Sequence, residues 1–83
     1  MKHTSHPEIV KRLKRAHGHL ATVLTMFEEG RTCLDLAQQL HAVEKAVANA
    51  KRELIHDHIE HCLEAPGEDG SSLVEIKMLT KYL

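Results

Sequence analysis

Apolar residues recur every three or four positions along two long stretches of the chain, the spacing that places them on one face of an α-helix. The first stretch runs from Ile9 to Phe27 and the second from Leu36 to Ile55. Residues 32–63 contain neither Pro nor Gly, so we expect one uninterrupted helix there. The pattern therefore predicts an all-α protein built around two long amphipathic helices.

Residues that cap helices define the ends of the first predicted helix, over residues 6–29. Ser5 and Glu8 form a capping box at its start, because each side chain can accept a hydrogen bond from a free backbone N–H. Gly30 is expected to end the helix, since glycine readily adopts the left-handed backbone that closes a helix.

The second helix is expected to begin at a Thr32 cap, and residues 66–70 form a turn-forming break after it. Ser72 then opens a short third helix that carries a further apolar pattern. We therefore interpret residues 1–83 as a single domain, a three-helix protomer with two long helices and a short third.

Two cysteines and a histidine lie on the second predicted helix, with Cys33 25 residues before His58 and 29 before Cys62. His58 and Cys62 are i,i+4 neighbours and can hold one metal ion together. Cys33 shares their face after about seven turns but lies roughly 37 Å from His58. It can join them only from a second, antiparallel copy, so the spacing predicts a homodimer with shared metal sites.

Other histidines could complete this site. His3 and His6 lie near the first helix cap, where either could supply a further ligand. His61 lies on the same predicted helix, directly before Cys62, and points about 100° away from it. Imidazole and thiolate together suit Ni(II), Co(II), Zn(II) and Cu(I). The alternative is that these histidines are solvated polar residues and that Cys62 is a structural, half-buried cysteine.

Basic residues concentrate near the start of the chain although its formal net charge is only −1. A broader basic surface in an oligomer could bind nucleic-acid phosphates with an affinity that falls with salt, and the alternative is a solvated helix face. No helix-turn-helix pattern is present. The candidate DNA-binding residues are Arg12, Lys14, Arg15, Lys45 and Arg52.

Composition excludes several classes of protein. A chain of 83 residues without Trp has a thin core, so association is an expected source of stability. No apolar run is long enough to span a membrane, and no signal peptide is evident, so we expect a cytoplasmic protein. No catalytic triad, phosphate-binding glycine loop or HExxH motif occurs, so we do not expect an enzyme.

The segments 12–20, 33–47 and 58–62 resemble the CsoR/RcnR family of bacterial metal-sensing and stress-sensing repressors. The resemblance implies an antiparallel four-helix-bundle dimer, often paired into a dimer-of-dimers tetramer. It also implies that Cys33 of one subunit meets His58 and Cys62 of the other, and that basic residues of the first two helices bind operator DNA. Inducer binding would then release the DNA and derepress an efflux or detoxification gene.

The resemblance leaves the inducer open between several ligands. Cys, His and Cys form the copper-sensor core, whereas nickel and cobalt sensors add an N-terminal His, which His3 or His6 could provide. The copper branch has a Tyr where this chain has Thr32. Its downstream Glu has no clear counterpart here, since the matching region holds Met78 near Glu75 and Lys77.

We therefore expect Ni(II) or Co(II) as the inducer, with Cu(I) or formaldehyde as alternatives within the family and Zn(II) as a metal that binds in vitro. A small metal-binding dimer that never contacts DNA is the alternative from another functional class.

Overall fold

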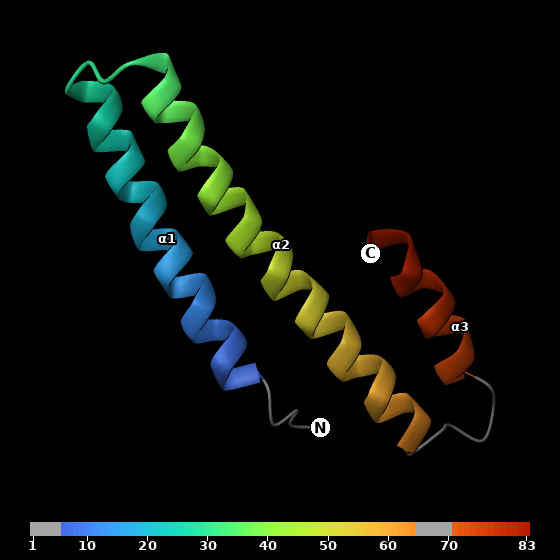
Figure 1. The fold of residues 1–83 in the computed structure, drawn as a ribbon. Coiled ribbons are helices and arrows are strands. Elements are labelled where there is room, and N and C mark those ends of the chain that lie inside the picture. The colour runs from blue at the N-terminus through green and yellow to red at the C-terminus, as the bar shows by residue number, and fades with distance from the viewer. Residues whose placement is uncertain (1–5, 65–70) are drawn as a thin grey trace.

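The computed structural model describes residues 6–64 and 71–83. It contains α1 (His6–Glu28), α2 (Cys33–Glu64), α3 (Ser71–Leu79) and the short 3₁₀ helix η1 (Thr80–Tyr82). Helices α1 and α2 form an antiparallel hairpin, and α3 lies beside the C-terminal part of α2 on the side away from α1 (Figure 1). No strand occurs in the two described ranges, which confirms the predicted all-α protomer.

The turn between α1 and α2 follows from its sequence. Gly30 has a φ of 71°, and its N–H donates to the Phe27 carbonyl while the Arg31 N–H donates to the Met26 carbonyl, both at 3.2 Å. These two bonds form a Schellman motif, which satisfies carbonyls at the end of the helix. The structure thus confirms that Gly30 ends the first helix.

The Thr32 side chain caps α2 as expected, because its Oγ1 accepts a hydrogen bond from the Asp35 N–H at 3.1 Å. Helix α3 begins at Ser71, one residue before the Ser72 expected from the sequence. The proposed cap at Ser5 and the predicted turn at 66–70 lie outside the described residues.

The core lies between α1 and α2, where Val23, Met26, Leu36 and Val43 form a buried cluster. Two buried alanines, Ala16 on α1 and Ala50 on α2, extend the contact between the same two helices. Both helices therefore bury one stripe against each other, and the hairpin is a single layer of helices.

The protomer is thin and extended. Its Cα atoms span 56 × 23 × 13 Å with a radius of gyration of 17.1 Å, whereas a compact chain of this length has a radius of roughly 12 Å. Its accessible surface is 6523 Å², against about 5,000 Å² for a typical monomer of this mass. Much apolar surface consequently stays uncovered in a single chain.

The uncovered apolar surface includes a regular stripe on α2. Leu40, Val47 and Leu54 follow one another at intervals of seven residues and are 41%, 45% and 42% exposed. Val47 and Leu54 also line an apolar groove between α1 and α2, together with Ile9 and Leu13. None of the described helices is long and apolar enough to cross a membrane.

Candidate metal centre

Three potential metal ligands meet where α2 ends and α3 folds back against it. His58 and Cys62, one helical turn apart on α2, come together with Glu75 of α3. One ligand atom from each side chain lies within 4.8 Å of the other two. His58 Nε2 lies 3.0 Å from Glu75 Oε1. The structure therefore brings together the His58 and Cys62 pair expected from the sequence, and adds a carboxylate.

Burial differs among these three groups. Cys62 is buried, whereas the His58 side chain is 26% exposed and the Glu75 side chain 56% exposed. The exposed fraction therefore rises from the Cys62 thiol to the His58 imidazole to the Glu75 carboxylate. Soft sulfur, borderline nitrogen and hard oxygen together suit a borderline divalent ion. The residues present thus fit a metal ion such as Ni(II), Co(II) or Zn(II).

Glu75 can serve such a site in two ways. It can supply an oxygen ligand. Alternatively, it can accept a hydrogen bond from the N–H at His58 Nε2, which leaves Nδ1 of the same ring to bind the metal. Both roles fix the orientation of the imidazole. The sequence offered no clear counterpart to the family's downstream glutamate, and in the structure Glu75 is the carboxylate that lies beside His58.

The sequence did not assign Glu75 to the metal site, because residues 65–70 separate the two helices. A helical register holds only within one helix, so the position of α3 relative to Cys62 could not be calculated from residue spacing. One signal was available, since Glu75 is the single acidic residue of α3.

Cys33 lies at the opposite end of α2 and is exposed. The 29 residues that separate it from Cys62 correspond to about 43 Å of helix. The single chain accordingly does not bring Cys33 to His58 and Cys62, as the sequence predicts. A site that uses all three residues needs a second subunit.

Neither His6 nor His61, the two other proposed ligands that the structure describes, joins this cluster in a single chain. His6 Nε2 lies 3.8 Å from Asp57 Oδ2, which ties the start of α1 to α2. His61 is half-buried and stands outside the cluster of His58, Cys62 and Glu75. His3 lies outside the described residues.

The five candidate DNA-binding residues divide into two groups. Arg12 forms an ion pair with Glu53 of α2, and Arg52 donates to Asn49 Oδ1 at 3.2 Å. Lys14, Arg15 and Lys45 are exposed, and none of them has an ion-pair partner within the described ranges.

The basic and apolar surfaces lie on different sides of the hairpin. Ala46 lines a groove that contains Arg12 and Arg15, whereas its neighbour Val47 lines the apolar groove. Successive residues of a helix point about 100° apart, so the two grooves flank the α1–α2 contact on opposite sides. A partner subunit on the apolar side would leave the basic side free.

Comparisons with known proteins find similar sequences and a similar solved structure. Residues 5–83 match the family described as "Metal-sensitive transcriptional repressor". The copper-sensing transcriptional repressor CsoR of Mycobacterium ulcerans (strain Agy99) is 37% identical over 70 residues, which cover 84% of this chain and 60% of that protein. CsoR of Bacillus subtilis (strain 168) is 38% identical over 56 residues, 68% of this chain and 55% of that protein.

A solved structure is similar over the full length of the chain. The nickel-responsive transcriptional regulator InrS has a TM-score of 0.84 and 31% identity, and the match covers 100% of this chain and 98% of that chain. The chain spans about 60% of the length of the CsoR protein of M. ulcerans. Its relatives thus include regulators named for copper and for nickel.

Proposed function

The chain belongs to the family of metal-sensitive transcriptional repressors. We propose that its apo form binds operator DNA and that binding of Ni(II) or Co(II) releases the protein from this DNA. The release derepresses genes for metal efflux. The observation that carries this proposal is the cluster of His58, Cys62 and Glu75 at one end of α2, with Cys33 on the same face at the other end. The family is one of repressors and not of enzymes, in agreement with the prediction from sequence.

A second copy of the chain completes the proposed metal site. An antiparallel pair of α2 helices aligns Cys33 of each subunit with Cys62 of the other. The same register aligns two opposite charges, because Glu44 follows Cys33 by 11 residues and Lys51 precedes Cys62 by 11 residues. Both side chains are exposed and have no ion-pair partner among residues 6–64 and 71–83. The charge pattern therefore supports the register that the ligands require.

Apolar residues between the two ends of α2 support the same pairing. Leu40, Val47 and Leu54 continue the seven-residue spacing that starts at Cys33, and such a repeat favours a long helix–helix seam. Burial of exposed apolar side chains stabilises association at roughly 25 cal/mol per Å² of area removed from water. A dimer formed on this face, or a tetramer of two such dimers, therefore covers the surface that the thin protomer leaves open.

The donor set supports a divalent metal as the inducer. A carboxylate is a hard ligand that suits Ni(II) and Co(II) better than Cu(I), which prefers soft sulfur. The metal supplies one shared point of attachment that links the α2 ends of two subunits. Cu(I) is the second candidate, favoured by the set of two thiolates and one imidazole and by the relatives named as copper-sensing. Zn(II) suits the same donors and is expected to bind in vitro.

Contacts between α1 and α2 give a route from the metal centre to the basic surface. Asp57 precedes His58 directly and lies beside His6, and Glu53 one turn earlier pairs with Arg12. A shift of the C-terminal turns of α2 therefore moves the start of α1, which carries the exposed cations. Metal binding releases DNA if it favours the conformation in which these cations fit the DNA less well. We place such a regulator in the cytoplasm, where its operator would be.

Fluorescence anisotropy on DNA from the gene's own upstream region tests this proposal, with Ni(II), Co(II), Cu(I), Zn(II) or formaldehyde added separately. We expect tight binding by the apo protein and loss of binding with Ni(II) or Co(II). Release by Cu(I) alone would identify a copper sensor, and release by formaldehyde alone a formaldehyde sensor. No DNA binding in any state would contradict the proposal and leave a metal-binding dimer.

Two variants separate the functions of the site and of the basic surface. Cys33→Ala should keep apo DNA binding but lose its response to metal, because the shared site lacks a ligand. Arg15→Glu should lose DNA binding and keep metal binding, since a reversed charge repels phosphates. Lys81→Glu, a charge reversal at an exposed position in η1, is the matched control and should change neither.

A further inference from the structure

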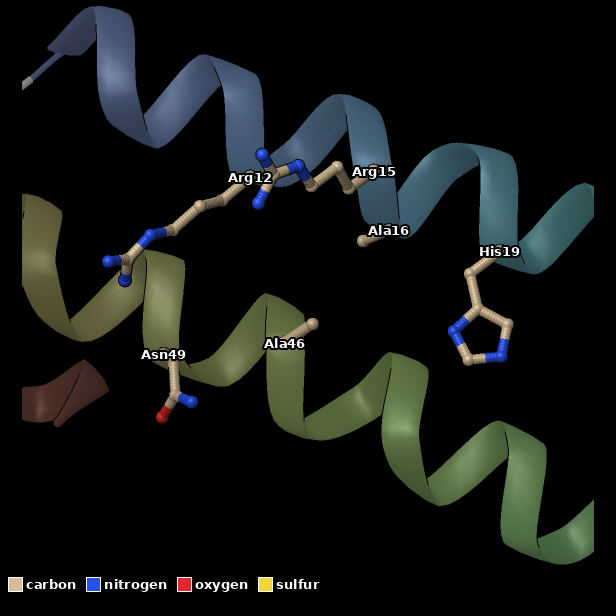
Figure 2. Close-up of a pocket in the computed structure, with 6 residues that line it drawn as sticks. All are labelled: Arg12, Arg15, Ala16, His19, Ala46 and Asn49. Carbon is tan, nitrogen blue, oxygen red and sulfur yellow. The ribbon is translucent and has the colours of Figure 1, made fainter.

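A cavity of about 250 Å³ opens between α1 and α2 on the basic side of the hairpin. Figure 2 shows Arg12 and His19 reaching from α1 toward α2, with Ala16 and Ala46 between them. The space exists because both central residues are alanines, whose methyl groups do not fill the gap between the helices. The cavity is lined by Arg12, Arg15, Ala16, His19, Ala46 and Asn49.

Polar contacts connect α1 and α2 at both ends of this cavity. At one end Arg12 pairs with Glu53. At the other end His19 Nε2 donates to Gln39 Oε1 at a distance of 2.6 Å. These contacts fix the separation of α1 and α2 across Ala16 and Ala46. The cavity is consequently a preformed feature of the hairpin.

The charges around the cavity favour an anion. Two guanidinium groups, Arg12 and Arg15, line it and no carboxylate does, although Glu53 offsets Arg12 from beside it. Arg15 has no ion-pair partner in the described part of the chain, and its side chain runs along α1 toward Arg12 (Figure 2). Its planar guanidinium offers five N–H donors in a fork that matches the oxygens of a phosphate.

Asn49 contributes further donors. Its Oδ1 accepts a hydrogen bond from Arg52 at 3.2 Å, and this contact leaves the two N–H groups of its side-chain amide available to another acceptor. Arginine and amide donors together are the groups that bind tetrahedral oxyanions, whereas a cation would be repelled by the two guanidinium groups.

We propose that this cavity binds one phosphate-class oxyanion, held by Arg15 with Asn49 and Arg12 beside it. The anion is either a phosphodiester of DNA or free inorganic phosphate. Only the first source rests on the proposed function, because binding of free phosphate does not depend on an operator. The cavity has room for a phosphate group and accompanying water molecules.

Methyl NMR of the full chain, labelled with ¹³C at its alanine methyl groups, tests the proposal with inorganic phosphate as the probe. Sodium chloride keeps the ionic strength constant throughout. We expect a saturable shift of the Ala16 methyl resonance. Arg15→Ala should weaken binding at least about tenfold, the effect of losing one charge-assisted hydrogen bond. Ala46→Leu should weaken it comparably, because leucine fills the cavity without changing its charge.

Two control variants distinguish a site from general electrostatic attraction. Lys11→Ala removes a charge from α1 outside the cavity, and Ala42→Leu enlarges an exposed residue one turn before Ala46. Both should change the phosphate affinity by less than about twofold, since neither touches the lining. Absence of a saturable shift, or an equal loss in the control variants, would overturn the proposal.

The DNA anisotropy experiment, repeated with phosphate or chloride at equal ionic strength, identifies the source of the anion. A larger loss of DNA affinity with phosphate supports a DNA phosphodiester in the cavity. Equal effects of the two salts, with phosphate still saturating the Ala16 signal, support free phosphate as the ligand. If phosphate binding is saturable but the protein binds no DNA, the result contradicts the proposed function and still supports the phosphate site.

Discussion

Single residues at the candidate metal centre would act through donor type and position. Cys62 is buried and supplies soft sulfur, while His58 bridges it to Glu75 on another helix. The Nε2–Oε1 distance of 3.0 Å restrains the imidazole ring in one orientation. A ring held in this way loses less conformational entropy on binding a metal. Glu75 is therefore the residue through which α3 affects the site.

Glu75→Gln tests this contribution. A neutral amide is a weaker ligand than a carboxylate and a weaker acceptor for the His58 N–H, so affinity for Ni(II) or Co(II) should fall about 10- to 100-fold. Competition with a chelator of known affinity measures the change. Glu60→Gln is the control, because Glu60 is exposed and does not belong to the cluster of His58, Cys62 and Glu75. It should have little effect on metal affinity. Equal affinities for the two variants would exclude a role for Glu75.

At the scale of the helices, two glycines have opposite roles. Gly30 ends α1 with a φ of 71°, a conformation that other residues adopt only with strain. Gly18 lies in the middle of α1, where an added Cβ would meet no atom within 4 Å. The first glycine is required by the turn, whereas the second only weakens the helix within this chain.

Alanine substitutions should therefore change stability in opposite directions. Gly18→Ala should raise the free energy of unfolding by about 1 kcal/mol, because alanine has the higher helix propensity. Gly30→Ala should lower it by about 1 kcal/mol, because it strains the left-handed residue of the turn. Urea denaturation followed by circular dichroism, at one fixed protein concentration, measures both. The same sign for the two variants would refute this interpretation of the turn and of α1.

The whole molecule is a single layer of helices with two different sides. The apolar side carries Leu40, Val47 and Leu54, and the basic side carries Arg12 and Arg15 around the cavity. A single layer of helices leaves both of these sides exposed. Association on the apolar side is therefore compatible with binding of anions on the basic side of the same assembly. This separation of surfaces would allow the proposed metal site between subunits and the proposed DNA surface to coexist.

Charge reversal tests the antiparallel register in the assembly. Glu44→Lys or Lys51→Glu alone places like charges opposite each other, and a two-fold dimer contains each pair twice. Each single variant should weaken dimerisation by roughly tenfold, and the double variant, which exchanges the charges, should restore it. Sedimentation equilibrium measures the dissociation constants. Failure of the double variant to recover would argue against this alignment of Cys33 with Cys62 of the partner subunit.

The local features of this protein were determined by its sequence. Apolar periodicity placed the two long helices, and Gly30 and Thr32 set the turn between them, because these effects depend on residues within one helical turn. The pairing of His58 with Cys62 also followed from spacing on one helix, as did the separation of both from Cys33.

Contacts between helices were decided only by the tertiary structure. Glu75 reaches His58 across residues 65–70, Arg12 meets Glu53, and Ala16 and Ala46 leave a cavity where the two long helices face each other. No residue spacing predicts these neighbours, because they depend on how one helix docks on another and on the side chains that fill the gap. The sequence supplied the ligands and cations, and helix packing decided which of them act together.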